Sequence, residues 1–157
     1  MTRQLVSRRS ITAGCAAIAA SCVSLQTHAG TLVDVEDEII QPQTPGEEAY
    51  IRRAFEMRQE AVNRGDQAYG AIVVRDKLII GQSWSRVVLD DDPTAHAEMA
   101  AIRDAAMRSG SARLNGATMY SSSRPCPMCE AACYWAGIHE MIHGRSADSA
   151  GSPTICR

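Results

Sequence analysis

The sequence predicts an α/β domain in which a mixed sheet carries helices on both faces. Segments with apolar residues at helical spacing alternate with short runs rich in β-branched residues. Their order is helix, strand, strand, helix, strand, helix, strand, which favours a sheet with helices packed against it. The apolar fraction of 45% and the charged fraction of 22% are those of a globular chain, and 157 residues are enough for one such domain.

Turn and capping residues delimit the expected elements. The first helix is expected to begin at residues 44–47, where Thr, Pro, Gly and Glu stand in the order of a helix start, and to end at Gly65. The other elements are expected as strands at 69–74 and 78–84, a helix at 94–108, a strand at 117–122, a helix at 125–136 and a strand at 138–143.

Residues 1–29 are expected to be a signal peptide rather than part of the fold. Three arginines precede an uncharged stretch rich in alanine and serine, and residues 7–11 resemble the twin-arginine export motif. We therefore expect a bacterial protein that is periplasmic or secreted. A lipid anchor at Cys22 is the second alternative.

Residues 30–46 are rich in acidic residues and contain two prolines, which is typical of a linker with little drive to fold. The functional domain is therefore expected over residues 47–157. The net charge of −2 argues against a nucleic-acid partner and favours a small molecule. The chain has no run of 18 apolar residues, so we expect no membrane span in the mature form.

Two short segments carry residues that bind metals. His96 and Glu98 open one expected helix, and Cys126 and Cys129 open another. One imidazole and two thiolates leave the fourth position of a tetrahedral zinc open, as in catalytic sites. The two cysteines are three residues apart, so one helical turn brings both to one face, where the helix N-terminus favours the thiolate form. A thiol–disulfide oxidoreductase remains an alternative, although it would not need His96 and Glu98. A non-catalytic zinc module is the other alternative, although it has no use for a carboxylate beside the metal.

These motifs resemble those of a known enzyme family. His96-x-Glu98, followed after 26 residues by Pro125-Cys126-x-x-Cys129, is similar to the signature of the zinc-dependent cytidine/nucleobase deaminase superfamily. Residues 69–71, 92–98 and 129–136 look like the guanine deaminase-like branch, to which tRNA adenosine deaminases are close cousins. The resemblance implies a cytidine deaminase-like three-layer sandwich with zinc on His96, Cys126 and Cys129.

The resemblance also implies hydrolytic deamination of a nucleobase or small aminated heterocycle, with a guanine-like purine favoured and ammonia released. Glu98 would move the protons, while Ala97 through its backbone N–H, Ser85 and Tyr69 would contact the substrate. Relatives are commonly homodimers, so a homodimer is expected. The alternatives are a catalytically inactive module of the same fold and a tRNA adenosine deaminase.

Three features depart from the family pattern. Purine-acting members usually have Asn where this chain has Ser85, and Glu is common where it has Arg124. Only 13 residues follow Gly144, so we expect a shortened C-terminal tail.

Overall fold

Five strands form one mixed sheet in the computed structural model, which describes residues 38–154. The strand order is β2–β1–β3–β4–β5, and within it β3 and β4 are parallel while the other neighbours are antiparallel. The strands are β1 (Gly70–Arg75), β2 (Leu78–Trp84), β3 (Thr118–Ser121), β4 (Glu140–His143) and β5 (Asp148–Gly151).

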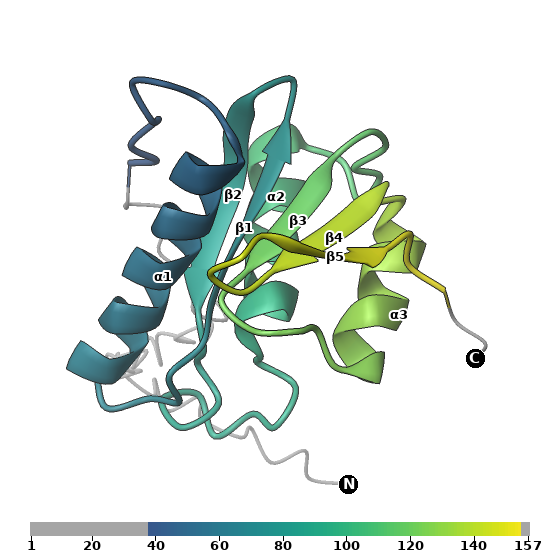
Figure 1. The fold of residues 1–157 in the computed structure, drawn as a ribbon. Helices are drawn as coiled ribbons and strands as arrows, with labels where there is room; N and C mark the ends of the chain where they lie inside the picture. Colours follow the sequence, from purple (N-terminus) through teal and green to yellow (C-terminus); the bar gives the residue numbers. More distant parts are fainter. Residues whose placement is uncertain (1–37, 155–157) are drawn as a thin grey trace, which may run out of the picture. The chain divides into compact units, whose positions relative to one another are not determined.

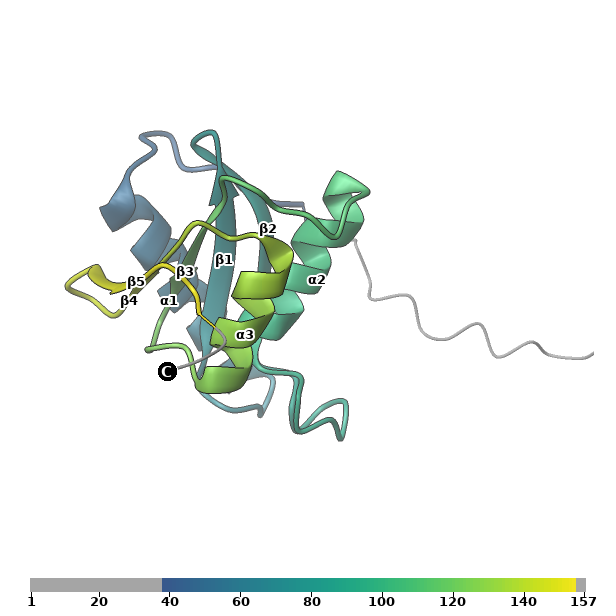
Figure 2. The same ribbon diagram turned by 90° about the vertical axis from the view of Figure 1, so that its right-hand side faces the viewer.

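Helices cover both faces of this sheet. Helix α1 (Glu47–Asn63) lies on one face, whereas α2 (Ala97–Ser109) and α3 (Pro127–Ala136) lie side by side on the other (Figures 1 and 2). The expected α/β fold with a mixed central sheet between helical layers is therefore confirmed.

The interior strand β1 shows why these residues form a sheet that is covered on both faces. Ile72 and Val74 belong to the apolar cluster beneath α1, while Ala71 and Val73 belong to the cluster beneath α2 and α3. Successive side chains of a strand point to opposite faces. A strand that is apolar at consecutive positions must therefore be covered on both sides.

Helix α1 starts later than the sequence predicts. The N-cap is Gly46, and no side chain caps the helix. Thr44, the expected cap, lies two residues upstream of Gly46. The backbone of Gly46 is extended, so the chain turns into the helix only at Glu47.

Strand β5 was not predicted. Its sequence, Asp148 to Gly151, has neither the alternation nor the β-branched residues that indicate a strand. Pairing with the neighbouring β4 forms it instead, with Ile142 opposite Ser149.

Part of the expected linker contacts the domain. The side-chain amide of Gln41 donates to the carbonyl oxygen of Ile79 at 2.8 Å and accepts from its N–H at 2.9 Å, which pairs it with the edge strand β2. The expected signal peptide and the linker up to residue 37 lie outside the described residues. Among the helices of residues 38–154, none is long and apolar enough to cross a membrane.

Candidate active site

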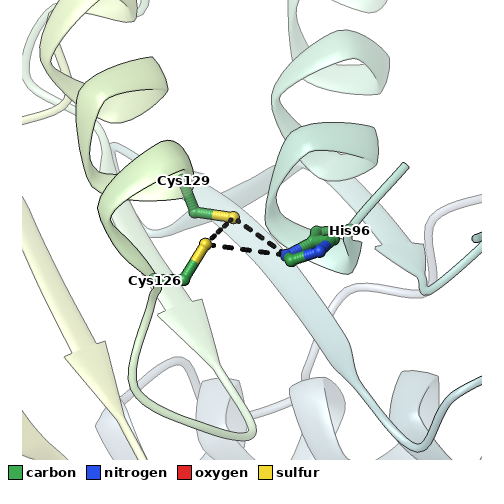
Figure 3. Close-up of side chains that lie close together, drawn as sticks. All are labelled: His96, Cys126 and Cys129. Atoms are coloured by element: carbon green, nitrogen blue, oxygen red, sulfur yellow. Dashed lines mark hydrogen bonds between the residues drawn. The ribbon is translucent and has the colours of Figure 1, made fainter. Parts of the chain in front are cut away.

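The N-termini of α2 and α3 meet on one face of the sheet and bring the two sequence motifs together. His96 is the N-cap of α2, and Cys126 is the N-cap of α3. Cys129 lies in the first turn of α3. Figure 3 shows the three side chains pointing toward one another across the space between the helices.

The three ligand atoms form a nearly equilateral triangle. The sulfurs of Cys126 and Cys129 are 3.6 Å apart, and each lies 3.7 Å from Nδ1 of His96. Zinc bonds of about 2.3 Å to sulfur and about 2.0–2.1 Å to nitrogen give tetrahedral edges of about 3.8 Å between sulfurs and about 3.6 Å from nitrogen to sulfur. The triangle therefore fits one tetrahedral zinc ion without rearrangement.

Glu98 lies beside this triangle in a buried position. Its side chain is 6% exposed, and the thiol of Cys129 is 3.6 Å from its Oε2 atom. Burial raises the pKa of Glu98, although its own backbone N–H, Cys129 and His96 oppose that shift. A carboxyl group with a raised pKa is suited to accept and return protons.

Burial also affects the protonation of the Cys129 thiol. Its pKa is raised by desolvation first and then by the neighbouring Glu98 carboxylate and Cys126. Desolvation therefore opposes the thiolate form that the helix N-terminus was expected to favour. A thiol in this position becomes a thiolate when a cation binds it, so the site favours metal over a reactive free cysteine.

A pocket of about 190 Å³ opens at the triangle. This is smaller than the pockets of about 300–1,000 Å³ that hold drug-sized ligands, and it suits a ligand of one or two rings. The residues that line the pocket are Gln67, Tyr69, His96, Glu98, Ser123, Arg124 and Cys126.

The expected substrate contacts occupy different positions relative to this pocket. Tyr69 is 46% exposed and lines it. Ser85 is 0% exposed and is not among the lining residues, and neither is Ala97, which is the first residue of α2. Two lining residues, Gln67 and Ser123, were missed because no motif includes them. Ser123 lies in the loop that leads into Cys126, whereas Gln67 lies in a distant turn that only the folded chain brings to the metal site.

The site thus combines three zinc-type ligands with a buried carboxylate at the mouth of a small pocket on an α/β sandwich. Residues 45–145 match the family model described as the cytidine and deoxycytidylate deaminase zinc-binding region. The chain belongs to this family, and its domain is a zinc-binding deaminase domain.

Individual relatives differ in activity. The chain is 42% identical over 90 residues to a guanine deaminase of Bacillus subtilis, covering 57% of this chain and 58% of the relative. It is 35% identical over 107 residues to a tRNA-specific adenosine deaminase of Haemophilus influenzae, covering 68% and 62%. The chain thus spans about three-fifths of the length of these relatives.

Solved structures agree with the fold. The X-ray structure of guanine deaminase from Bacillus subtilis superimposes with a TM-score of 0.61 at 34% identity. The superposition covers 69% of this chain and 72% of that chain.

Proposed function

We propose that the protein is a zinc-dependent hydrolytic deaminase of a nucleobase or a small aminated heterocycle. The observation that carries this proposal is the buried carboxylate of Glu98 beside the His96, Cys126 and Cys129 triangle. A purely structural zinc site has no use for a carboxylate that does not complete its ligand set.

In this reaction the amino group of an amidine-like ring carbon is replaced by oxygen from water, and ammonia leaves. His96, Cys126 and Cys129 would hold the zinc ion, which would supply the Lewis acidity that makes water nucleophilic near neutral pH. Glu98 accepts a proton from the attacking water and delivers it to the ring nitrogen next to the attacked carbon. It then accepts the second proton from the hydroxyl group formed at that carbon and passes it to the leaving amine, so that the C–N bond breaks and a C=O group forms. Burial keeps the Glu98 carboxyl out of bulk water during these transfers.

A guanine-like purine is the favoured substrate. The relative with 42% identity is a guanine deaminase, and the pocket of about 190 Å³ suits a free ring better than a large ligand. Tyr69 contacts the ring from the pocket wall, and the N–H of Ala97 meets a polar ring atom. Ser85 is fully buried, so it would act on the ring through Tyr69, whose carbonyl oxygen accepts the Ser85 N–H at 3.0 Å.

A tRNA adenosine deaminase is the second candidate. The 35% identity to such an enzyme favours it, whereas the net charge of −2 does not suit a polyanionic partner. A catalytically inactive module of the same fold is the remaining alternative.

Ammonia release by the purified zinc-loaded protein tests these alternatives. Free bases, nucleosides and a tRNA anticodon stem-loop are offered in parallel, and we expect turnover of a free base. Turnover of the stem-loop alone would identify the RNA enzyme, and no turnover of any compound would support the inactive module.

Glu98→Gln tests the assigned role of the carboxylate. This variant should keep its zinc and its fold. Its rate of deamination should fall by about 10²–10⁴-fold, because Gln cannot transfer protons. Glu48→Gln, an exposed change on α1, is the matched control and should retain full activity. Activity of Glu98→Gln within tenfold of wild type would remove Glu98 from the mechanism.

Export through the twin-arginine route is a further proposal. That route carries folded proteins, so zinc could bind Cys126 and Cys129 before they meet an oxidising compartment. Replacing Arg8 and Arg9 by Lys should trap the precursor in the cytoplasm, whereas Arg3→Lys should not. Normal export of the double variant, shown by cell fractionation, would argue against this route and in favour of alternatives such as lipidation at Cys22.

We also propose that the protein is a homodimer, as its relatives commonly are. Light scattering of the purified protein should give twice the mass of one chain. The mass of a single chain across the working concentration range would contradict this.

A further inference from the structure

Asp66 ties together two loops that lie far apart in the sequence. Its side chain is buried in the turn after α1, and its carboxylate accepts the N–H of Gln67 at 2.7 Å. In the loop between β2 and α2, it accepts the N–H groups of Val88 at 2.9 Å and Leu89 at 3.0 Å. Burial by itself raises the pKa of Asp66, but these donors and the nearby Ser85 hydroxyl outweigh burial and lower it.

The turn that follows Asp66 places Gln67 at the pocket. The carbonyl oxygen of Gln67 accepts the N–H of Tyr69 at 2.7 Å, and the carbonyl oxygen of Tyr69 accepts the N–H of Ser85 at 3.0 Å. Both backbone polar groups of Gln67 are therefore held by the protein. Its side chain is exposed, lines the pocket and forms no hydrogen bond within residues 38–154.

Three of the other residues that line the pocket already have a role in the proposed reaction. His96 and Cys126 belong to the metal site, and Glu98 belongs to the proton transfers. Among the lining residues Gln67 alone has a side-chain amide, which offers an acceptor oxygen and a donor nitrogen side by side. Such an amide pairs bidentately with a ring edge that carries a neighbouring donor and acceptor.

We infer that Gln67 is a specificity-determining residue that recognises the lactam edge of an oxo-substituted ring, with Asp66 as its positioning residue. This inference rests on the proposed deaminase function and narrows the substrate class to amino-oxo heterocycles. The side-chain amide oxygen of Gln67 accepts the N–H of the ring, and the amide nitrogen donates to the neighbouring oxo oxygen.

A pair of related substrates separates recognition from chemistry. Guanine carries the lactam edge, whereas 2-aminopurine has the same 2-amino group but no oxo group. Gln67→Ala should lower kcat/KM for guanine by about five- to a hundredfold, because lactam atoms are left unpaired in the pocket. It should change kcat/KM for 2-aminopurine less than threefold.

Gln59→Ala is the matched control, because Gln59 is an exposed amide on α1 outside the pocket. It should leave the guanine to 2-aminopurine ratio unchanged. Equal losses on both substrates in Gln67→Ala, or no loss, would overturn the assignment of Gln67. If the wild-type protein prefers a different ring, the same ratio is measured with that ring and its analogue lacking the oxo group, and a preferred ring without an oxo group also overturns it.

Asp66→Asn tests the positioning role. The Asn side chain keeps the shape but only one acceptor oxygen, so the two loops are held less firmly. The guanine to 2-aminopurine ratio should fall in the same direction as in Gln67→Ala, with the helical circular dichroism unchanged. An equal loss on both substrates would leave Asp66 a purely structural residue and overturn the positioning role. Absence of any deamination by the wild-type protein would instead count against the proposed function.

Discussion

Cys126 and Cys129 lie one helical turn apart at the start of α3. Their surroundings differ from those of Cys133, a third cysteine farther along this helix. Cys133 is fully buried in the apolar cluster beneath α2 and α3, where burial raises the pKa of its thiol to about 12. It is not part of the triangle that Cys126 and Cys129 form with His96. Position along one helix therefore separates two candidate metal ligands from a packing residue.

This difference predicts the metal content of two variants. Wild-type protein should contain about one zinc per chain, and Cys126→Ser should lose most of it, because a hydroxyl is a poor ligand for zinc. Cys133→Ala should keep its zinc, although it removes a sulfur from the same helix. Elemental analysis checks both variants, and unchanged zinc in Cys126→Ser would contradict the assigned ligand set.

The buried Asp66 carboxylate predicts how stability depends on pH. Its pKa is lowered from 3.8 in the folded protein, so its charged form stabilises the fold above that pH. This contribution is lost as the pH falls below 3.8 and through the lower folded pKa. Asp66→Asn should therefore unfold more easily than wild type at pH 6, and the difference should shrink toward pH 2.

Urea denaturation at several pH values measures this difference. Asp91→Asn, an exposed change in the loop between β2 and α2, serves as the control. A stability difference between Asp66→Asn and wild type that stays constant from pH 6 to pH 2 would show that the Asp66 charge is not involved.

At the scale of elements, α2 packs closely on β2 because β2 contains Gly81. A Cβ atom at Gly81 would lie 2.5 Å from the Cβ and N atoms of Ala105 and 2.7 Å from the carbonyl oxygen of Ala101. Two of these three neighbours are helix backbone, which cannot shift without moving α2. Small residues on both elements therefore set the depth at which α2, and His96 at its start, lies on the sheet.

Gly81→Ala should consequently destabilise the domain by about 1–3 kcal/mol through overpacking. Leu78→Ala, at a position of the same strand that is 53% exposed, should change the free energy of unfolding by less than about 0.5 kcal/mol. Thermal unfolding of the two variants provides the comparison. Equal stability of Gly81→Ala and wild type would mean that α2 is free to shift.

For the whole molecule, a metal at the triangle would join α2 to α3 and so couple two segments that are about 30 residues apart. Chelation of zinc should therefore lower the stability of the entire domain. A ligand at a hundred times its Kd stabilises by about 2.7 kcal/mol, which corresponds to roughly 5–20 °C in Tm for a domain of this size.

Calorimetry with and without a chelator measures this coupling. Glu98→Gln should show the same shift as wild type, whereas Cys126→Ser should show almost none. A wild-type Tm that does not respond to complete zinc removal would mean that the metal does not contribute to the fold.

Local spacing in the sequence determined much of this protein. Short apolar runs between turn residues predicted β1 to β4, and helical spacing predicted all three helices, with ends displaced by up to three residues. The single turn between Cys126 and Cys129 predicted that both sulfurs share one face, because helix geometry alone sets that distance. His96 and Glu98 were also recognisable from local spacing, because they lie two positions apart in one short motif.

Tertiary structure decided the rest. Strand β5 forms because β4 offers it a pairing edge, which no property of residues 148–151 indicates. Gln67 lines the pocket, whereas Ser85 is fully buried outside it. The hydrogen bonds of Asp66 and the backbone hydrogen bond between Tyr69 and Ser85 determine where each of these residues lies. Such placements depend on contacts between segments far apart in the chain, and the packing that makes those contacts has no signature in the neighbouring residues.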